Sequence, residues 1–253
     1  MKVSFDATGE VVVITGGAQG IGAALAAAVQ ASGGTAVVFD VAKPADPAVE
    51  YVEVDVADRS SAQTAVGAVL RRYGRIDGLV AGAAVQPRSP VLEMDSAEWT
   101  RTLQVNLDGV MWMCQAVVPD MVSRRSGSVV VFTSGMAATG FAGASAYTAS
   151  KAALVAFAKS LAAEVAEHRV RVNVIAPGVI DTEQFRGANA GADREHWHDT
   201  IGIGDPEDVV GPLLFLLSDA AAMTGSVLTR ERVFAKLAAF AERKTTTVSR
   251  SDE

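Results

Sequence analysis

Tyr147 and Lys151, a tyrosine and a lysine four residues apart, are the side chains of this sequence best suited to acid–base chemistry. They lie in an alanine-rich stretch that predicts a helix, and residues four apart share one helix face. A phenol with a pKa of about 10 is a poor base at neutral pH, and a neighbouring ammonium favours the phenolate. The pair could therefore exchange protons with a substrate oxygen. Taken alone, the same spacing also fits a solvated helix face.

Two more polar residues have positions that suit a catalytic site. Ser134 follows the apolar run 129–132, where the end of a parallel strand can meet a ligand. Its hydroxyl could hold a substrate oxygen against the phenol, or it could cap a turn. Asn106 interrupts an apolar helical pattern, so its amide either satisfies a kink or orders water near the active site.

A glycine-rich turn at residues 15–22, with the sequence TGGAQGIG, joins a predicted strand to a predicted helix. Its glycines allow a tight turn, and the free N–H groups at the start of the helix attract a diphosphate. The spacing departs from the dinucleotide fingerprint Gly-x-Gly-x-x-Gly, so a plain tight turn is the alternative. The candidate cofactor contacts are Gly16, Gln19, Gly20, Ile21 and Gly22.

Two aspartates indicate how an adenosine would be bound. Asp40 ends the second predicted strand, where a carboxylate can accept hydrogen bonds from the ribose. Its charge disfavours each unit of charge on a 2′-phosphate by roughly 1–4 kcal/mol, and neither Gln19 nor Val41 supplies a cation. NAD is therefore expected rather than NADP, unless Asp40 is a solvated strand end. Asp55 could contact the adenine amino group or cap the helix that begins at Arg59.

The elements that must position these residues alternate regularly along the chain. Strands are predicted at 10–15, 35–40, 49–54, 76–81, 128–134 and 170–175, and helices at 20–32, 59–73, 96–122 and 146–167. This alternation without hairpins predicts an α/β fold: a single-domain, doubly wound parallel sheet of the Rossmann type with helices on both faces. Residues 183–204 predict a mobile loop beyond a strand end.

Composition limits the classes of partner. The chain has 253 residues, enough for one domain, and its 29 acidic and 22 basic residues give a charge of −7, which disfavours nucleic acid. A lone cysteine, Cys114, fits a reducing compartment. We see no signal peptide and no apolar run long enough to cross a bilayer, so a cytoplasmic location without membrane contact is expected.

Taken together, these residues resemble the classical short-chain dehydrogenase/reductase family over roughly residues 8–229. The resemblance also includes Asp55-Val56 and the segment 177–182. It implies that Tyr147 is the acid/base, that Lys151 binds the nicotinamide ribose and lowers the pKa of the phenol, and that Ser134 orients the substrate oxygen. Asn106 would support a proton-relay water. Further contacts to the cofactor are implied for Val56, Ala81, Gly82, Pro177, Gly178, Ile180 and Thr182.

The resemblance implies a homotetramer and a substrate lid. Trp112, Met113 and Val155 are apolar candidates for subunit contacts. In the lid, Phe185 and Trp197 are expected either to contact substrate or to pack structurally. No metal is expected, because His196 and His198 lack an acidic or thiol partner at ligand spacing.

The chain departs from the family pattern in two places. Ala81-Gly82-Ala83-Ala84 replaces Asn-Asn-Ala-Gly, so side-chain hydrogen bonds that stiffen this turn are missing. After residue 229 the expected glycines are absent, and residues 230–253 predict an amphipathic helix with a polar tail outside the catalytic domain 1–229.

The sequence thus predicts an NAD-dependent oxidoreductase that interconverts a secondary alcohol and a ketone by hydride transfer. The alternatives are an epimerase or dehydratase with bound NAD, and a non-catalytic protein that responds to NAD.

Overall fold

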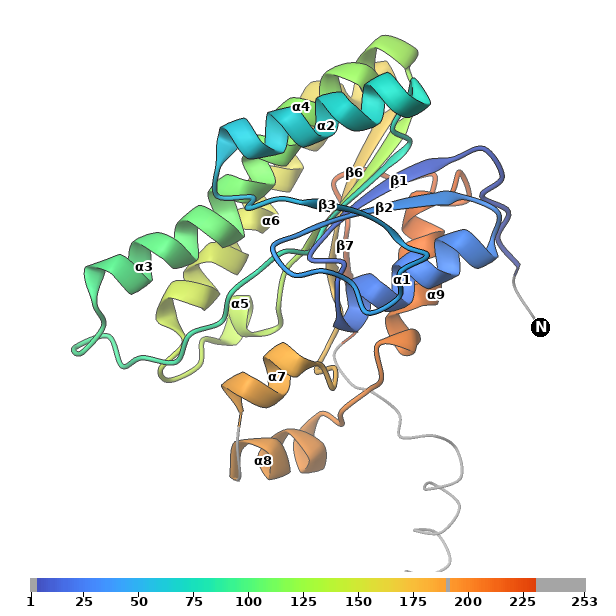
Figure 1. Ribbon diagram of the computed structural model, residues 1–253. Helices are drawn as coiled ribbons and strands as arrows, with labels where there is room; N and C mark the ends of the chain where they lie inside the picture. Colours follow the sequence, from blue (N-terminus) through green and yellow to red (C-terminus); the bar gives the residue numbers. More distant parts are fainter. Residues whose placement is uncertain (1–3, 190–191, 231–253) are drawn as a thin grey trace, which may run out of the picture.

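The computed structural model describes residues 4–189 and 192–230, and in this part of the chain seven parallel strands form one sheet (Figure 1). The order across the sheet is β3-β2-β1-β4-β5-β6-β7. The strands are β1 (Val11–Thr15), β2 (Thr35–Asp40), β3 (Glu50–Glu53), β4 (Gly78–Ala81), β5 (Gly127–Phe132), β6 (Val170–Ala176) and β7 (Val227–Thr229). The direction of winding reverses between β1 and β4, which confirms the predicted doubly wound sheet.

Helices cover both faces of the sheet (Figure 1). One face carries α2 (Arg59–Tyr73), α4 (Gly109–Arg124) and α6 (Ser145–Val165), and the other carries α1 (Gly20–Ala31) and α9 (Glu207–Leu217). In β1, Val11 and Val13 face the first helix layer, whereas Val12 and Ile14 face the second. Because side chains alternate across a strand, burial on both faces requires the continuous apolar run seen in the sequence.

The predicted helix 96–122 is divided into three parts. It consists of α3 (Ser96–Leu103), the π-helical turn η1 (Gln104–Asp108) and α4. A π-helical turn inserts an extra residue into the helix, and such turns are common at functional sites. Asn106 lies in η1 and is fully buried. The irregularity predicted for this asparagine is therefore present in the helix.

The prediction of a mobile loop over 183–204 is wrong in part, because this segment contains α7 (Glu183–Ala188) and α8 (Ala192–Thr200). Thr182 caps α7, since its hydroxyl accepts a hydrogen bond from the Phe185 N–H at 3.1 Å. Phe185 and Trp197 are buried, at 9% and 7% exposure. Burial of these two aromatic rings offsets the weak helix propensity of the glycines and polar residues around them.

The helices α5 (Met136–Thr139) and α9 and the strand β7 were not predicted from the sequence, whereas the 3₁₀ turn η2 (Ala166–His168) falls at the end of the predicted helix 146–167. Apart from Arg230, the helix predicted after residue 229 lies outside the described residues. No helix within the described ranges is both long and apolar enough to cross a membrane.

One candidate for subunit contact has to be withdrawn. Met113 lies on the buried face of α4 and is fully buried in the core, so it cannot contact another subunit. Trp112 and Val155 are only partly buried.

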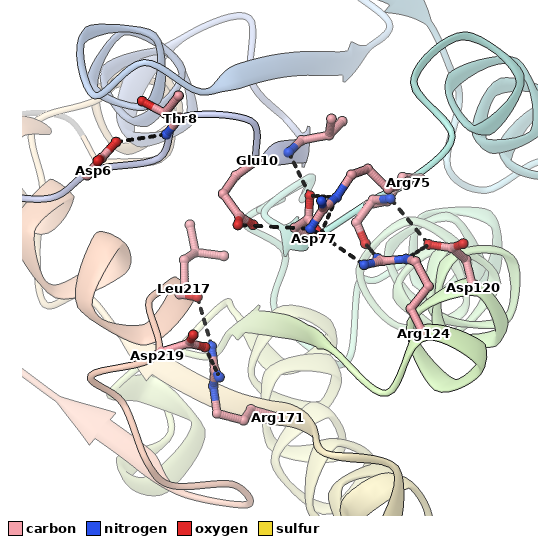
Figure 2. Close-up of polar contacts among 12 residues, drawn as sticks. Asp6, Thr8, Glu10, Arg75, Asp77, Asp120, Arg124, Arg171, Leu217 and Asp219 are labelled. Atoms are coloured by element: carbon pink, nitrogen blue, oxygen red, sulfur yellow. Dashed lines mark hydrogen bonds and ion pairs between the residues drawn. The ribbon is translucent and has the colours of Figure 1, made fainter.

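An ion-pair network braces the amino ends of β1, β4 and β5, at the edge of the sheet shown in Figure 2. The buried carboxylate of Asp77 pairs with Arg75 at 2.6 Å and with Arg124 at 3.0 Å. It also accepts the Val11 N–H at 2.9 Å. Arg124 extends the network to Asp120 at 2.9 Å.

Candidate active site

A cavity of about 1100 Å³ opens at the carboxyl ends of the strands, beside the point where the winding reverses. This is where open α/β sheets bind ligands, and the volume exceeds the ~300–1,000 Å³ typical of small-molecule sites. The space suits a dinucleotide together with a substrate. The predicted site residues that line it are Gly16, Gln19, Gly20, Ile21, Gly22, Asp40, Asp55, Val56, Gly82, Ser134, Tyr147, Lys151, Pro177, Gly178, Ile180 and Thr182.

Two predicted site residues, Ala81 and Asn106, lie behind this wall. Ala81 is the last residue of β4 and is 2% exposed. Asn106 is fully buried, and its amide is engaged by the protein: Oδ1 accepts the Val85 N–H at 2.8 Å, while Nδ2 donates to the Val85 carbonyl at 2.9 Å and to Ser150 Oγ at 3.1 Å. Asn106 therefore positions the wall instead of forming its surface.

The glycine turn is packed backbone against backbone. Gly16 has φ of +70°, and a Cβ there would lie 2.8 Å from the Ala83 nitrogen. At Gly22 a Cβ would lie 2.4 Å from the Gly16 carbonyl oxygen. Neither contact is tolerable, so glycine is required at both positions. The result is an open cradle of backbone at the start of α1, as a diphosphate requires.

The hydrogen bonds expected to be missing from residues 81–84 are replaced by another side chain. The Thr15 hydroxyl, at the end of β1, accepts the N–H groups of Gly82 and Ala83 at 3.1 and 3.2 Å. Just after this turn, the backbone N–H and carbonyl of Val85 are both hydrogen-bonded to the Asn106 side chain. The turn is thus fixed at both ends without the asparagines of the family pattern.

The two aspartates of the adenosine end have different partners. Asp40 accepts the N–H groups of Ala18 and Ala42, each at 3.0 Å, which ties the end of β2 to the glycine turn. Asp55 pairs with Arg101 at 3.0 Å. It does not cap α2, because Asp58 does so by accepting the Ser60 N–H at 2.8 Å.

Ser134, Tyr147 and Lys151 come together on the wall of the cavity. The Lys151 nitrogen lies 5.8 Å from the centre of the Tyr147 ring, which confirms that the two residues share a helix face. The hydroxyls of Tyr147 and Ser134 are hydrogen-bonded. Ser134 also accepts the Met136 N–H at 3.3 Å, at the start of α5. Lys151 is 3% exposed and donates to the Phe132 carbonyl at 3.0 Å.

The pKa values of the pair differ from the sequence expectation. Burial raises the pKa of the Tyr147 phenol, and the hydrogen bond from Ser134 and the charge of Arg88 oppose this rise only in part. Burial also lowers the pKa of Lys151 to about 8. The charge of Arg88, which no sequence pattern places near the site, also lowers the pKa of the phenol.

Sequence reasoning missed several polar residues around the cavity. Gln184 donates to the Ala84 carbonyl at 3.1 Å, and Arg230 lines the cavity and donates to the Pro177 carbonyl at 3.2 Å. Arg88 contacts residues about one hundred positions away. No local spacing signals such contacts, because only the fold brings these segments together. Phe185 and Trp197 line the cavity and are also buried, so each ring both packs against the protein and contributes to the cavity wall.

The parallel sheet, the glycine cradle and the cavity at the strand ends define a Rossmann-type nucleotide-binding α/β fold. Residues 10–193 match the family model for short chain dehydrogenases. The chain belongs to the short-chain dehydrogenase/reductase family: it is an oxidoreductase that acts on alcohol or ketone groups with a nicotinamide cofactor.

Several characterised relatives are similar over nearly the whole fold. The chain is 35% identical to the 3-oxoacyl-(acyl-carrier-protein) reductase FabG of Thermotoga maritima, over 87% of this chain and 95% of the relative. It is 36% identical to D-threitol dehydrogenase of Mycolicibacterium smegmatis, over 88% and 92%. The solved aldohexose dehydrogenase of Thermoplasma acidophilum superposes with a TM-score of 0.81 at 29% identity, covering 89% of this chain and 92% of that one.

Proposed function

We propose that this protein interconverts a secondary alcohol and a ketone with NAD, and that Tyr147 is the acid/base. The observation that carries the proposal is that Ser134, Tyr147 and Lys151 meet on the wall of a cavity that also contains the glycine cradle. A proton-transfer group and a dinucleotide cradle in one cavity are what this reaction needs.

The residues present fit a nicotinamide dinucleotide. The backbone cradle at Gly16 and Gly22 leaves room for a diphosphate, and the segment 177–182 lines the same cavity near the acid/base. A Cβ at Gly20 would lie 2.9 Å from Thr182 Cγ2, so the two segments approach each other closely. When bound, the nicotinamide accepts or supplies the hydride at the substrate carbon.

The chain's own residues manage the proton. In the oxidation, the substrate hydroxyl gives its proton to the Tyr147 oxygen; in the reduction, Tyr147 returns it to the carbonyl oxygen. Ser134 is hydrogen-bonded to the phenol and can orient the same substrate oxygen. The raised pKa of Tyr147 keeps the phenol protonated at neutral pH, which favours reduction there, and oxidation should speed up as the pH rises.

NAD is favoured over NADP by the charge at the adenosine end. Asp40 lines the cavity and would repel a 2′-phosphate. Of the described residues that line the cavity, three are cations, and each is bonded elsewhere: Arg101 to Asp55, Lys151 to the Phe132 carbonyl and Arg230 to the Pro177 carbonyl.

Replacing Tyr147 by phenylalanine tests the proposal. We expect Tyr147→Phe to lower kcat by at least about 10²-fold, because it removes the proton carrier, while NAD still raises the melting temperature. Tyr73→Phe is the matched control, since its hydroxyl bonds Glu50 away from the cavity. Full turnover by Tyr147→Phe on a verified alcohol would refute the role of Tyr147. Stronger thermal stabilisation by NADP than by NAD would refute the reading of Asp40.

A further inference from the structure

Four side chains from separate segments meet beside the substrate end of the cavity. Arg88 comes from the loop after β4, Phe141 from the loop between α5 and α6, Asn189 from the end of α7 and Trp197 from α8. We call these four residues the Arg88 cluster. Trp197 lines the cavity, so the cluster connects the cavity wall to segments far apart in the sequence.

Asn189 is the centre of the hydrogen bonds in this cluster. It is 2% exposed, and its Oδ1 accepts from Arg88 Nη2 at 2.8 Å and from Trp197 Nε1 at 3.3 Å. Its Nδ2 donates to the Phe185 carbonyl at 2.9 Å. A single buried amide therefore joins both helices of the 183–200 segment to Arg88.

Arg88 holds the cluster from the other side. Its Nε donates to the Ala188 carbonyl at 3.2 Å, and its guanidinium lies 4.5 Å from the centre of the Phe141 ring. The Phe141 ring stacks on Trp197 at 5.3 Å with an interplanar angle of 28°. A planar guanidinium can bond the helix end and cover an aromatic face at the same time, whereas a lysine cannot match both contacts.

We infer that Arg88 is a positioning residue that fixes α7 and α8 over the substrate end of the cavity. The kinetic part of the test below rests on the proposed role of Tyr147, whereas the inference itself concerns only the arrangement of the chain.

The position of Arg88 also bears on Tyr147. Among the described groups, those that act on the phenol come from its own helix, which carries Lys151, and from the segments after β5 and β4, which carry Ser134 and Arg88. The charge of Arg88 lowers the pKa of the phenol and so opposes the effect of burial. His196 lies edge-on to Trp197 at 5.2 Å and is exposed.

The test compares Arg88→Gln with Arg88→Lys. The first variant removes the charge, and the second keeps the charge but loses the planar guanidinium with its several N–H donors. Arg186→Gln is the matched control, because Arg186 lies on α7 but pairs with Asp181 and Glu183. Two measurements use the full chain alone: ultraviolet titration of the Tyr147 phenol, with Tyr147→Phe as the blank, and hydrogen exchange of the backbone at 183–189 and 195–204.

For Arg88→Gln we expect a higher pKa of the Tyr147 phenol, faster exchange in both segments, and about a tenfold loss of kcat/KM at neutral pH, the size expected for one unit charge in a partly solvated site. Arg88→Lys should exchange faster but keep the phenol titration near that of the wild type. Arg186→Gln should change neither measurement.

Wild-type exchange and an unchanged phenol titration in Arg88→Gln would overturn the inference. If Arg88→Gln does not fold, Asn189→Ala replaces it, and wild-type exchange in that variant would overturn the inference equally. Because both measurements are made without turnover, they stay informative if Tyr147→Phe remains active and the proposed reaction is wrong.

Discussion

Burial displaces the pKa values of Tyr147 and Lys151 in opposite directions. It disfavours the charged form of each group, so it raises the pKa of the phenol and lowers that of the ammonium to about 8. At 3% exposure the lysine is therefore costly to keep charged, whereas Arg88, which is bonded to the end of α7 and lies over the Phe141 ring, keeps its guanidinium charge.

The displaced pKa of Lys151 makes a prediction about stability. Between pH 8 and 10.5 the unfolded chain binds a proton at Lys151 that the folded chain does not, so this residue makes the folded state more stable as the pH rises. Lys151→Met removes this contribution. From pH 8 to 10.5, the free energy of unfolding of the wild type should rise relative to that of the variant by about 3 kcal/mol, measured by urea denaturation.

The comparison of the two chains isolates Lys151 from other titrating groups. The raised pKa values of Tyr147 and Cys114 make the folded state less stable as the pH rises above their unfolded values, and they do so in both chains. A constant difference between wild type and Lys151→Met across this range would mean that Lys151 is not desolvated as described.

At the scale of the element, the π-helical turn η1 matters because it directs one amide at the cofactor wall. Asn106 satisfies both backbone groups of Val85, and Val85 lines the cavity. An asparagine is unfavourable on the apolar face of a regular helix. In the π-helical turn, the Asn106 amide instead bonds the N–H and the carbonyl of Val85.

Asn106→Ala should therefore weaken cofactor binding as well as stability. It leaves two backbone groups of Val85 without their partner, which costs about 1–3 kcal/mol each if they remain buried. We expect a higher KM for NAD and faster hydrogen exchange at residues 82–86.

Asn173→Ala is the matched control for this variant. Asn173 is equally buried, donates to the Met223 carbonyl at 2.9 Å and accepts the Ser226 N–H at 3.1 Å. It should lose similar stability with an unchanged KM for NAD. Equal changes of KM in both variants would show that Asn106 acts on stability alone.

At the scale of the whole molecule, the carboxyl ends and the amino ends of the strands have different roles. The carboxyl ends of the strands carry the cavity, and the amino ends carry the network of Asp77, Arg75, Arg124 and Asp120 (Figure 2). The site is built from loops and helices that follow the carboxyl ends, and the network at the opposite ends ties the starts of β1 and β4 to the end of α4.

Asp77→Asn should destabilise the protein without changing its catalytic constants. The neutral amide compensates the positive charge of the partly buried Arg124 guanidinium less well than a carboxylate does. We expect a loss of about 2–4 kcal/mol in the free energy of unfolding. This is less than for a fully buried ion pair, because Arg75 is nearly half exposed. Chemical denaturation measures the loss. Asp219→Asn is the control, since Asp219 pairs with Arg171 while fully exposed, and no measurable change is expected. A normal stability of Asp77→Asn would show that the network contributes little.

The homotetramer implied by the family resemblance is also a property of the whole molecule, and it remains a proposal. Trp112 and Val155 lie on α4 and α6, on one face of the sheet, and each keeps part of its surface exposed. We expect light scattering to give a mass four times that of the 26.2 kDa chain, and a chain truncated after Thr229 to remain folded. A monomeric mass would contradict the proposed assembly.

The sequence determined the first six strands of the sheet, the glycine turn and the pairing of Tyr147 with Lys151. Each depends on local rules: apolar runs form buried strands, glycines permit the turn at Gly16, and residues four apart share a helix face. Only the tertiary structure decided what surrounds these groups. It showed that burial raises the pKa of the phenol, that Thr15 replaces the absent asparagines, and that Arg88 joins residues one hundred positions away. Desolvation and long-range contacts depend on which segments the fold brings together, and no short stretch of sequence contains that information.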